Sequence, residues 1–152
     1  MEEASAGLKG SLSRVTKSYG RVLLKPDLFT SFYERFLKSS PKIKPKFENT
    51  NMEKQHALLR RGVSMVIMFA GGGKAAEGAI TNIQRTHSVN NLNIEPELYG
   101  FWRKSLVDTI ATFDPNFTEE LREDWNRILQ VGIDHIVAGY HVGTGSKVSV
   151  NS

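Results

Sequence analysis

The sequence contains no cysteine among its 152 residues. This absence excludes disulfide bonds, thiolate metal ligands, cysteine nucleophiles and the attachment of a cofactor through thioether bonds. Any bound metal or cofactor must therefore be held by histidine, by carboxylates or by non-covalent contacts.

Long hydrophobic runs are absent as well. The longest apolar segment, VSMVIMFA at residues 63–70, is far shorter than the ~18 residues that a membrane-spanning helix needs. The first ten residues, MEEASAGLKG, lack the basic start and apolar stretch of a secretion signal. We therefore expect a soluble, cytoplasmic protein that does not enter a membrane.

Acidic residues are scarce in the first part of the chain. Residues 1–61 hold 13 of the 20 Lys and Arg but only 6 of the 16 Asp and Glu. Such an asymmetry fits a solvated basic surface or a surface that docks an acidic partner. Three lysines of this part, Lys42, Lys44 and Lys46, alternate with Ile43 and Pro45 and form no nucleic-acid-binding motif, so no nucleic-acid partner is expected.

Apolar residues recur at steps of three and four along the chain, which predicts helices, and no segment shows the alternation of a strand. The predicted helices cover the regions around 8–15 and 29–37, then 52–70, 77–88, 96–113 and a last helix that follows Thr118. Pro26 is expected in the first turn of the second helix, Gly71 to Gly73 as a stop, and Thr118 as an N-cap. This pattern predicts one all-α domain over residues 1–141 and a polar C-terminal tail over residues 142–152.

His87 shares a helical face with Ile80 and Ile83, so its imidazole is predicted to point inward from the last helical turn. This position alone fits a buried histidine with one hydrogen bond as well as it fits a metal ligand. The residues around it along the chain favour the second interpretation. They are, in order, Phe32-Tyr33, Phe36, Pro41, Phe47, the run Gln55-His56-Ala57-Leu58-Leu59, His87 and Tyr99.

This ordered set resembles the globin family over roughly residues 10 to 140. It is similar to bacterial single-domain globins and to the globin module of flavohemoglobins. The resemblance implies a globin fold, a three-over-three helical sandwich around a heme pocket. It also implies non-covalent heme b, with His87 as the proximal iron ligand and its Nδ1–H bonded to an acceptor, expected to be a backbone carbonyl one turn back.

The resemblance assigns further roles in the pocket. Tyr33, Gln55 and Leu59 match distal positions that contact a gas ligand, and a shift of one residue would give His56 that role or that of a second axial ligand. The expected heme-contacting residues are Phe36, Phe47, Val63, Ile83, Leu92, Tyr99, Phe101 and Leu106. Candidates for binding the heme propionates are Lys54, Arg60 and Arg85, whereas His135 and His141 are expected at the surface.

Two departures from flavohemoglobins are visible. The segment between His87 and Tyr99 is two residues longer than expected, and Tyr140 stands where those proteins carry a glutamate that strengthens the proximal histidine. The leading hypothesis is thus reversible binding of dioxygen or another diatomic gas, for transport, storage or scavenging, by a monomer or dimer. The alternatives are a nitric oxide dioxygenase or peroxidase-like enzyme that needs a separate reductase, and a heme-free signalling module with a separate partner protein.

Overall fold

The computed structural model describes residues 2–141, with side chains from residue 7 onward, so the expected tail at 142–152 lies outside the described residues. The described part contains six α-helices and one short 3₁₀ turn, with no strand, which confirms the all-α prediction. The helices are α1 (Glu2–Val22), α2 (Leu28–Lys38), α3 (Met52–Ala70), α4 (Lys74–Thr86), α5 (Leu98–Phe113) and α6 (Glu119–Ala138), and the turn is η1 (Lys44–Phe47).

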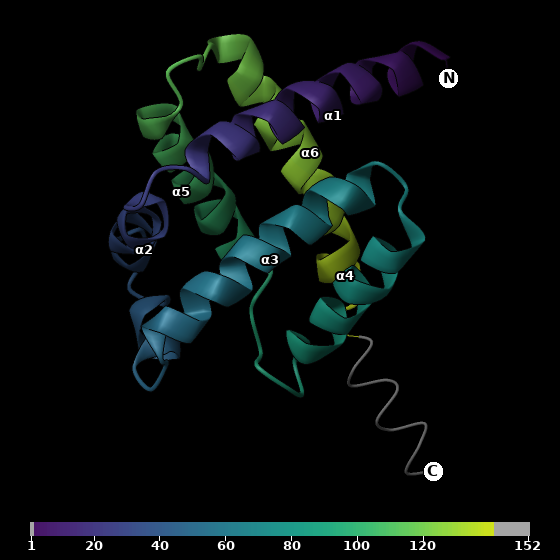
Figure 1. The fold of residues 1–152 in the computed structure, drawn as a ribbon. Coiled ribbons are helices and arrows are strands. Elements are labelled where there is room, and N and C mark those ends of the chain that lie inside the picture. The colour runs from purple at the N-terminus through teal and green to yellow at the C-terminus, as the bar shows by residue number, and fades with distance from the viewer. Residues whose placement is uncertain (1, 142–152) are drawn as a thin grey trace, which may run out of the picture.

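The helices pack in two layers (Figure 1). α1, α3 and α4 each pack on α6, while α2 packs on α5, and α5 in turn contacts α6. None of the described helices is long and apolar enough to cross a membrane. The N-terminal layer thus covers the two C-terminal helices, and the chain between α2 and α3 turns a corner at one end of the molecule.

Helix ends follow local signals. The Thr118 side chain accepts a hydrogen bond from the Leu121 amide at 3.1 Å, as predicted for an N-cap. Gly71 ends α3, and Gly72 adopts φ +86, a left-handed conformation that glycine accepts without strain. Asn51 caps the start of α3 by accepting from the Lys54 amide.

Several predicted boundaries were wrong: α1 begins at Glu2 and runs to Val22, beyond the predicted 8–15, and α4 ends at Thr86, before the predicted Ser88. α2 begins at Leu28, so Pro26 lies in the turn before the helix and not in its first turn. α4 begins at Lys74, three residues earlier than predicted, because the chain turns at Gly72 and can resume a helix at once. α5 begins at Leu98 because the Leu98 amide closes a turn on the Glu95 carbonyl around Pro96.

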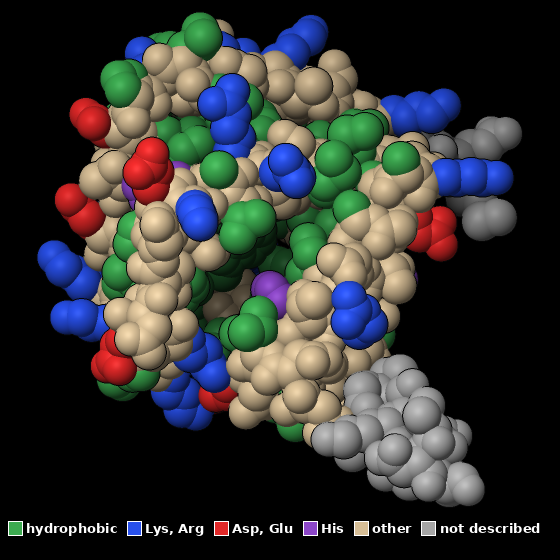
Figure 2. All heavy atoms as spheres, turned by 60° about the horizontal axis from the view of Figure 1, so that its bottom comes forward, with side chains coloured by type: hydrophobic (Ala, Val, Ile, Leu, Met, Phe, Trp, Pro, Cys, Tyr) green, Lys and Arg blue, Asp and Glu red, His purple; other side chains and the backbone are tan. Residues whose placement is uncertain are grey.

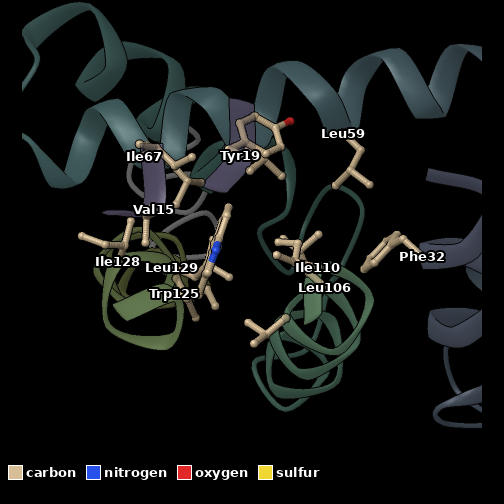
Figure 3. Close-up of a cluster of buried hydrophobic side chains, with 14 of the residues drawn as sticks. Val15, Tyr19, Phe32, Leu59, Ile67, Leu106, Ile110, Trp125, Ile128 and Leu129 are labelled. Carbon is tan, nitrogen blue, oxygen red and sulfur yellow. The ribbon is translucent and has the colours of Figure 1, made fainter. Parts of the chain in front are cut away.

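The core is centred on Trp125, which is fully buried among apolar side chains of α1, α3 and α6 (Figure 3). Its indole N–H donates to the buried Ser18 hydroxyl at 2.9 Å, and that hydroxyl donates to Asp114 at 2.6 Å. A Cβ added at Gly132 of α6 would lie 3.0 Å from the Val66 side chain of α3. The absence of a side chain at Gly132 therefore lets α3 and α6 cross closely, and this sets the place of α3 over the core.

A second polar contact ties α1 to α6. The Asp124 carboxylate is nearly inaccessible and accepts hydrogen bonds from the Ser11 hydroxyl at 2.7 Å and from Arg14 Nε at 2.6 Å. Hydrogen bonding to Arg14 and Ser11 lowers the pKa of Asp124 below its ordinary value of 3.8, although burial opposes this shift. The ionised carboxylate is therefore the form that stabilises the folded chain.

We predict that Asp124→Asn lowers the free energy of unfolding at pH 7 by about 1–3 kcal/mol, because the buried Ser11 hydroxyl and the half-exposed Arg14 guanidinium lose a charged, buried acceptor. Since the folded pKa is depressed, this stabilisation is present above pH ~4 and is lost as the pH falls through the folded value. Urea unfolding between pH 7 and pH 3 should show the wild-type and variant curves converging in acid. Glu120→Gln, at an exposed carboxylate near the same arginine, is the control and should change stability by less than about 0.5 kcal/mol; equal effects of the two variants would contradict the prediction.

Candidate functional site

His87 is the C-cap residue of α4, and its ring lies at the junction of α4 with the loop that leads to α5. Its Nδ1 is 3.0 Å from the Tyr99 hydroxyl, and the two rings stack with centroids 6.2 Å apart. The partner of Nδ1 is thus a phenol of α5, and the backbone carbonyl that the sequence suggested was the wrong partner. When Nδ1–H donates to Tyr99, the Nε2 lone pair is left free to bind a metal.

Burial keeps this pair uncharged. Removal from water lowers the pKa of His87 below its ordinary 6.5, so the neutral imidazole predominates at pH 7. Burial raises the pKa of Tyr99, and the neighbouring Tyr140 raises it further. Both groups are therefore neutral near pH 7, which is the state in which imidazole coordinates iron.

A second cluster of rings brings together α2, η1 and α3. Tyr33 is almost fully buried, and its ring lies 5.9 Å from that of Phe47 and 6.5 Å from that of Phe36. Burial raises the pKa of Tyr33 to about 12, and hydrogen bonding to the Gln55 side chain partly opposes this shift. The phenol is hence protonated at neutral pH and can donate a hydrogen bond.

Gln55 and His56, at the start of α3, both contact Tyr33, but in different ways. The Gln55 side chain is near enough to the phenol to lower its pKa, whereas the His56 ring stacks on the phenol with centroids 5.3 Å apart and planes only 4° apart. His56 also lies 6.3 Å from the Phe29 ring. Leu59 and Val63 follow at four-residue steps on α3, and both are buried. An apolar face of α3 thus continues from the polar groups of the cluster.

Figure 2 shows a hollow on the side of the molecule that lies at the bottom of Figure 1. Hydrophobic side chains line it, a histidine lies within it, and Lys and Arg side chains stand on the surrounding surface. Among the described residues no group of three or more His, Cys, Asp and Glu side chains could hold a metal ion.

The structure does not bring all the sequence-predicted residues together. Ile83 is partly buried against the core, and Leu106 is fully buried in it. Leu92 is 61% exposed on the loop after His87. Phe101 lies away from the ring cluster, at the outer groove between α2 and α5 that Arg35, Lys38 and Lys104 also line. Phe101 therefore faces a different side of α5 from Tyr99.

The remaining candidates are at the surface. Lys54, Arg60 and Arg85 are exposed, and the Arg85 side chain donates to Asn82 at 2.7 Å. His135 Nε2 is 3.1 Å from the Thr81 hydroxyl, and its ring packs near Phe69. His141 is exposed, and its ring meets the Tyr140 ring edge to face, with centroids 4.7 Å apart. His141 thus has the surface position expected from the sequence, whereas His135 is half-buried.

Sequence reasoning missed the contacts of Asn93 and Lys46. Asn93 has φ 51, a left-handed conformation, and accepts a hydrogen bond from the Tyr140 hydroxyl. Lys46 belongs to a lysine run that sequence patterning interpreted as solvated surface, yet its ammonium group bonds the Asn93 carbonyl at 2.9 Å. The pair Asn90-Asn91 before Leu92 and Asn93 signalled a turn, but no local pattern pointed to a lysine 47 residues away.

Comparisons with known proteins agree with this architecture. The sequence model of the Globin family matches residues 30–136. A crystal structure from Pseudomonas aeruginosa PAO1, of protein PA3967, described as structurally highly homologous to a human hemoglobin, superposes with a TM-score of 0.83 at 35% sequence identity. The match covers 86% of this chain and 98% of that one. No curated protein sequence matches. The predicted three-over-three globin fold is confirmed, and the chain belongs to the globin family.

Proposed function

We propose that the protein binds heme b non-covalently through His87 and reversibly binds dioxygen or another diatomic gas beside Tyr33, Gln55 and Leu59. The observation that carries this proposal is the buried His87 imidazole, which burial favours in its neutral form and whose Nδ1 lies 3.0 Å from the Tyr99 hydroxyl. With Nδ1–H as the donor in this contact, Nε2 is free to bind iron. Heme supplies the iron at which a diatomic gas binds.

The residues present fit such a group. A porphyrin needs an apolar slot, and Phe36, Phe47, Val63, Ile83 and Tyr99 supply apolar or aromatic surface near the two ring clusters. Its propionates need cations, and the candidates Lys54, Arg60 and Arg85 are exposed. Covalent attachment through cysteine is excluded because the chain has none.

The distal side is suited to holding a gas that carries partial negative charge. Tyr33 is protonated, buried and a hydrogen-bond donor, and in dry surroundings such a bond is stronger than in water. Gln55 is the polar neighbour of this phenol, and the buried Leu59 follows one helical turn later on α3. These groups favour dioxygen retention over fast release.

We favour gas binding over nitric oxide dioxygenase or peroxidase-like chemistry. Hydrogen bonding to a carboxylate would make the proximal imidazole more basic and push electron density toward the distal side. The partner of His87 is instead a neutral phenol, Tyr99, with Tyr140 beside it. Turnover would also require electrons from a separate reductase, whereas reversible gas binding requires none.

His56 is a candidate second axial ligand under this proposal. In the described conformation its ring stacks on Tyr33 and lies tilted against Phe29. Absorption spectra of the ferric and ferrous protein separate the two states. A low-spin spectrum without added ligand would assign the sixth position to His56, and a high-spin spectrum would leave that position open to gas.

We predict that the purified chain reconstituted with hemin shows a Soret band and that His87→Gly loses tight binding because the iron loses its only proximal ligand. Added imidazole should restore the band, since it fills the space of the missing side chain. His135→Ala, at the Thr81 contact, is the matched control and should retain hemin. A wild-type chain without a Soret band would contradict the heme proposal and favour the heme-free signalling module. If His87→Gly retained hemin without imidazole, the iron ligand would be another residue.

We predict that Tyr33→Phe raises the dioxygen dissociation rate about tenfold, because a hydrogen bond worth about 1.5 kcal/mol is removed. The rate can be measured by rapid mixing of the oxygenated protein with carbon monoxide. Tyr19→Phe provides the control, as its hydroxyl donates to the Arg60 carbonyl at 2.9 Å and is not part of the ring cluster. An unchanged rate in Tyr33→Phe would remove this phenol from gas retention.

A further inference from the structure

Three segments that are distant in the sequence meet at Asn93, on the loop between α4 and α5. The Lys46 ammonium group donates to the Asn93 carbonyl at 2.9 Å. The Tyr140 hydroxyl donates to Asn93 Oδ1, and the Asn93 amide donates to the Ser88 carbonyl at 3.0 Å. The loop is therefore held from one side by η1 and from the other by the end of α6.

Two ion pairs reinforce the contact between the corner and the loop. Lys46 Nζ lies 2.9 Å from Glu95 Oε1, with the side chains 26% and 30% exposed. Lys42 Nζ lies 2.6 Å from Glu97 Oε1, with both side chains more than half exposed. Hydrogen bonding to Lys46 lowers the pKa of Glu95, so the pair is ionised at neutral pH. The inner pair contributes more, because exposed pairs are screened by solvent and salt.

The Lys46–Asn93 contact lies beside both halves of the site. Phe47, of the Tyr33 ring cluster, directly follows Lys46. On the other side, the Ile94 amide donates to the His87 carbonyl at 3.0 Å, next to Asn93. Asn93 keeps its left-handed φ of 51, which asparagine tolerates better than most residues. The corner and the histidine are thus joined through Lys46, Asn93 and one backbone hydrogen bond.

We propose that Lys46 and Asn93 are positioning residues that clasp the α2–α3 corner to the α4–α5 loop and so hold Phe47 and His87 in a fixed relation. The consequence for heme, which rests on the proposed function, is slower heme loss. The Tyr33 ring cluster and His87 come from separate elements. The contacts of Lys46 with Asn93 and Glu95 connect the η1 corner, which carries Phe47, to the loop that follows His87. Breaking it should loosen the loop even when no ligand is bound.

The first test measures the loop itself by hydrogen exchange on the full chain without heme. In Lys46→Gln the Ile94 amide should exchange about threefold to tenfold faster, because the loop loses an ion pair and a charge-assisted hydrogen bond. Lys44→Gln removes the same charge from the same turn, at a lysine that makes no ion pair with any described residue, and should leave that amide unchanged. Lys46→Arg should retain most of the protection. Equal exchange in Lys46→Gln and Lys44→Gln would overturn the clasp.

Tyr140→Phe gives an independent test, because it removes only the hydroxyl that bonds Asn93 Oδ1. It should also accelerate exchange at Ile94. A double-mutant cycle of Lys46→Gln and Glu95→Gln should be non-additive, since the two side chains share one contact. Additive effects, or no effect of Tyr140→Phe, would contradict the arrangement.

The second test uses the heme-loaded protein. Lys46→Gln should transfer heme to an acceptor apoprotein about threefold to tenfold faster than Lys44→Gln, and the difference should shrink as salt is added. The ferrous iron–imidazole stretching band should shift or broaden in Lys46→Gln and return in Lys46→Arg. Faster exchange at Ile94 in Lys46→Gln, in a chain that does not bind heme, would support the clasp and refute the proposed function. Heme binding with unchanged Ile94 exchange and unchanged heme transfer in Lys46→Gln would refute the clasp alone.

Discussion

The buried indole of Trp125 is the constraint on which the rest of the molecule depends. An indole N–H removed from water needs an acceptor, and Ser18 of α1 supplies it. Ser18 can serve because it in turn bonds Asp114, whose carboxylate is neutralised by Arg21 at 2.7 Å. One large apolar side chain thus fixes α1, the end of α5 and α6 relative to one another. α3 is then seated on α6 by the close approach of Val66 to Gly132.

The two halves of the candidate site depend on this core in different ways. Tyr33, Phe36, Gln55 and Leu59 stand on α2 and α3, whose buried faces hold them directly. His87 stands at the end of α4, where helical hydrogen bonding ceases, and its position relies on Tyr99 and on the loop that follows. The loop in turn depends on α6, since the Val89 amide donates to the Tyr140 carbonyl at 3.0 Å. A histidine outside a helix interior is therefore held by contacts from three other segments.

The chemistry of the proximal side follows from the neutrality of these groups. Under the proposed function, an acceptor that carries no charge would leave the His87 imidazole a weaker donor to iron than a carboxylate partner would. Charge is instead concentrated at the rim, where Lys42 and Lys46 pair with Glu97 and Glu95. The protein thus keeps ionised groups out of the site interior and uses them to join its edges. This division is consistent with the proposed binding of a neutral gas, which needs no electron transfer.

Much of this was determined by the sequence itself. Local signals were sufficient to predict an all-α chain and the observed bounds of α3. They are the helical periodicity, the Gly71 to Gly73 break and the Thr118 cap, each of which acts within a few residues. The ordered residues from Phe32 to His87 were sufficient to predict membership of the globin family, which the comparisons confirm. The roles of the individual site residues remain proposals. Tyr99 was a possible partner of His87 from the sequence, but only the tertiary structure decided that its hydroxyl, and not a backbone carbonyl, meets Nδ1. Only the tertiary structure likewise decided that Phe101 faces an outer groove and that Lys46 reaches Asn93. These contacts join segments far apart along the chain, and they depend on how helices cross and on which way each side chain leaves its helix, which no local pattern encodes.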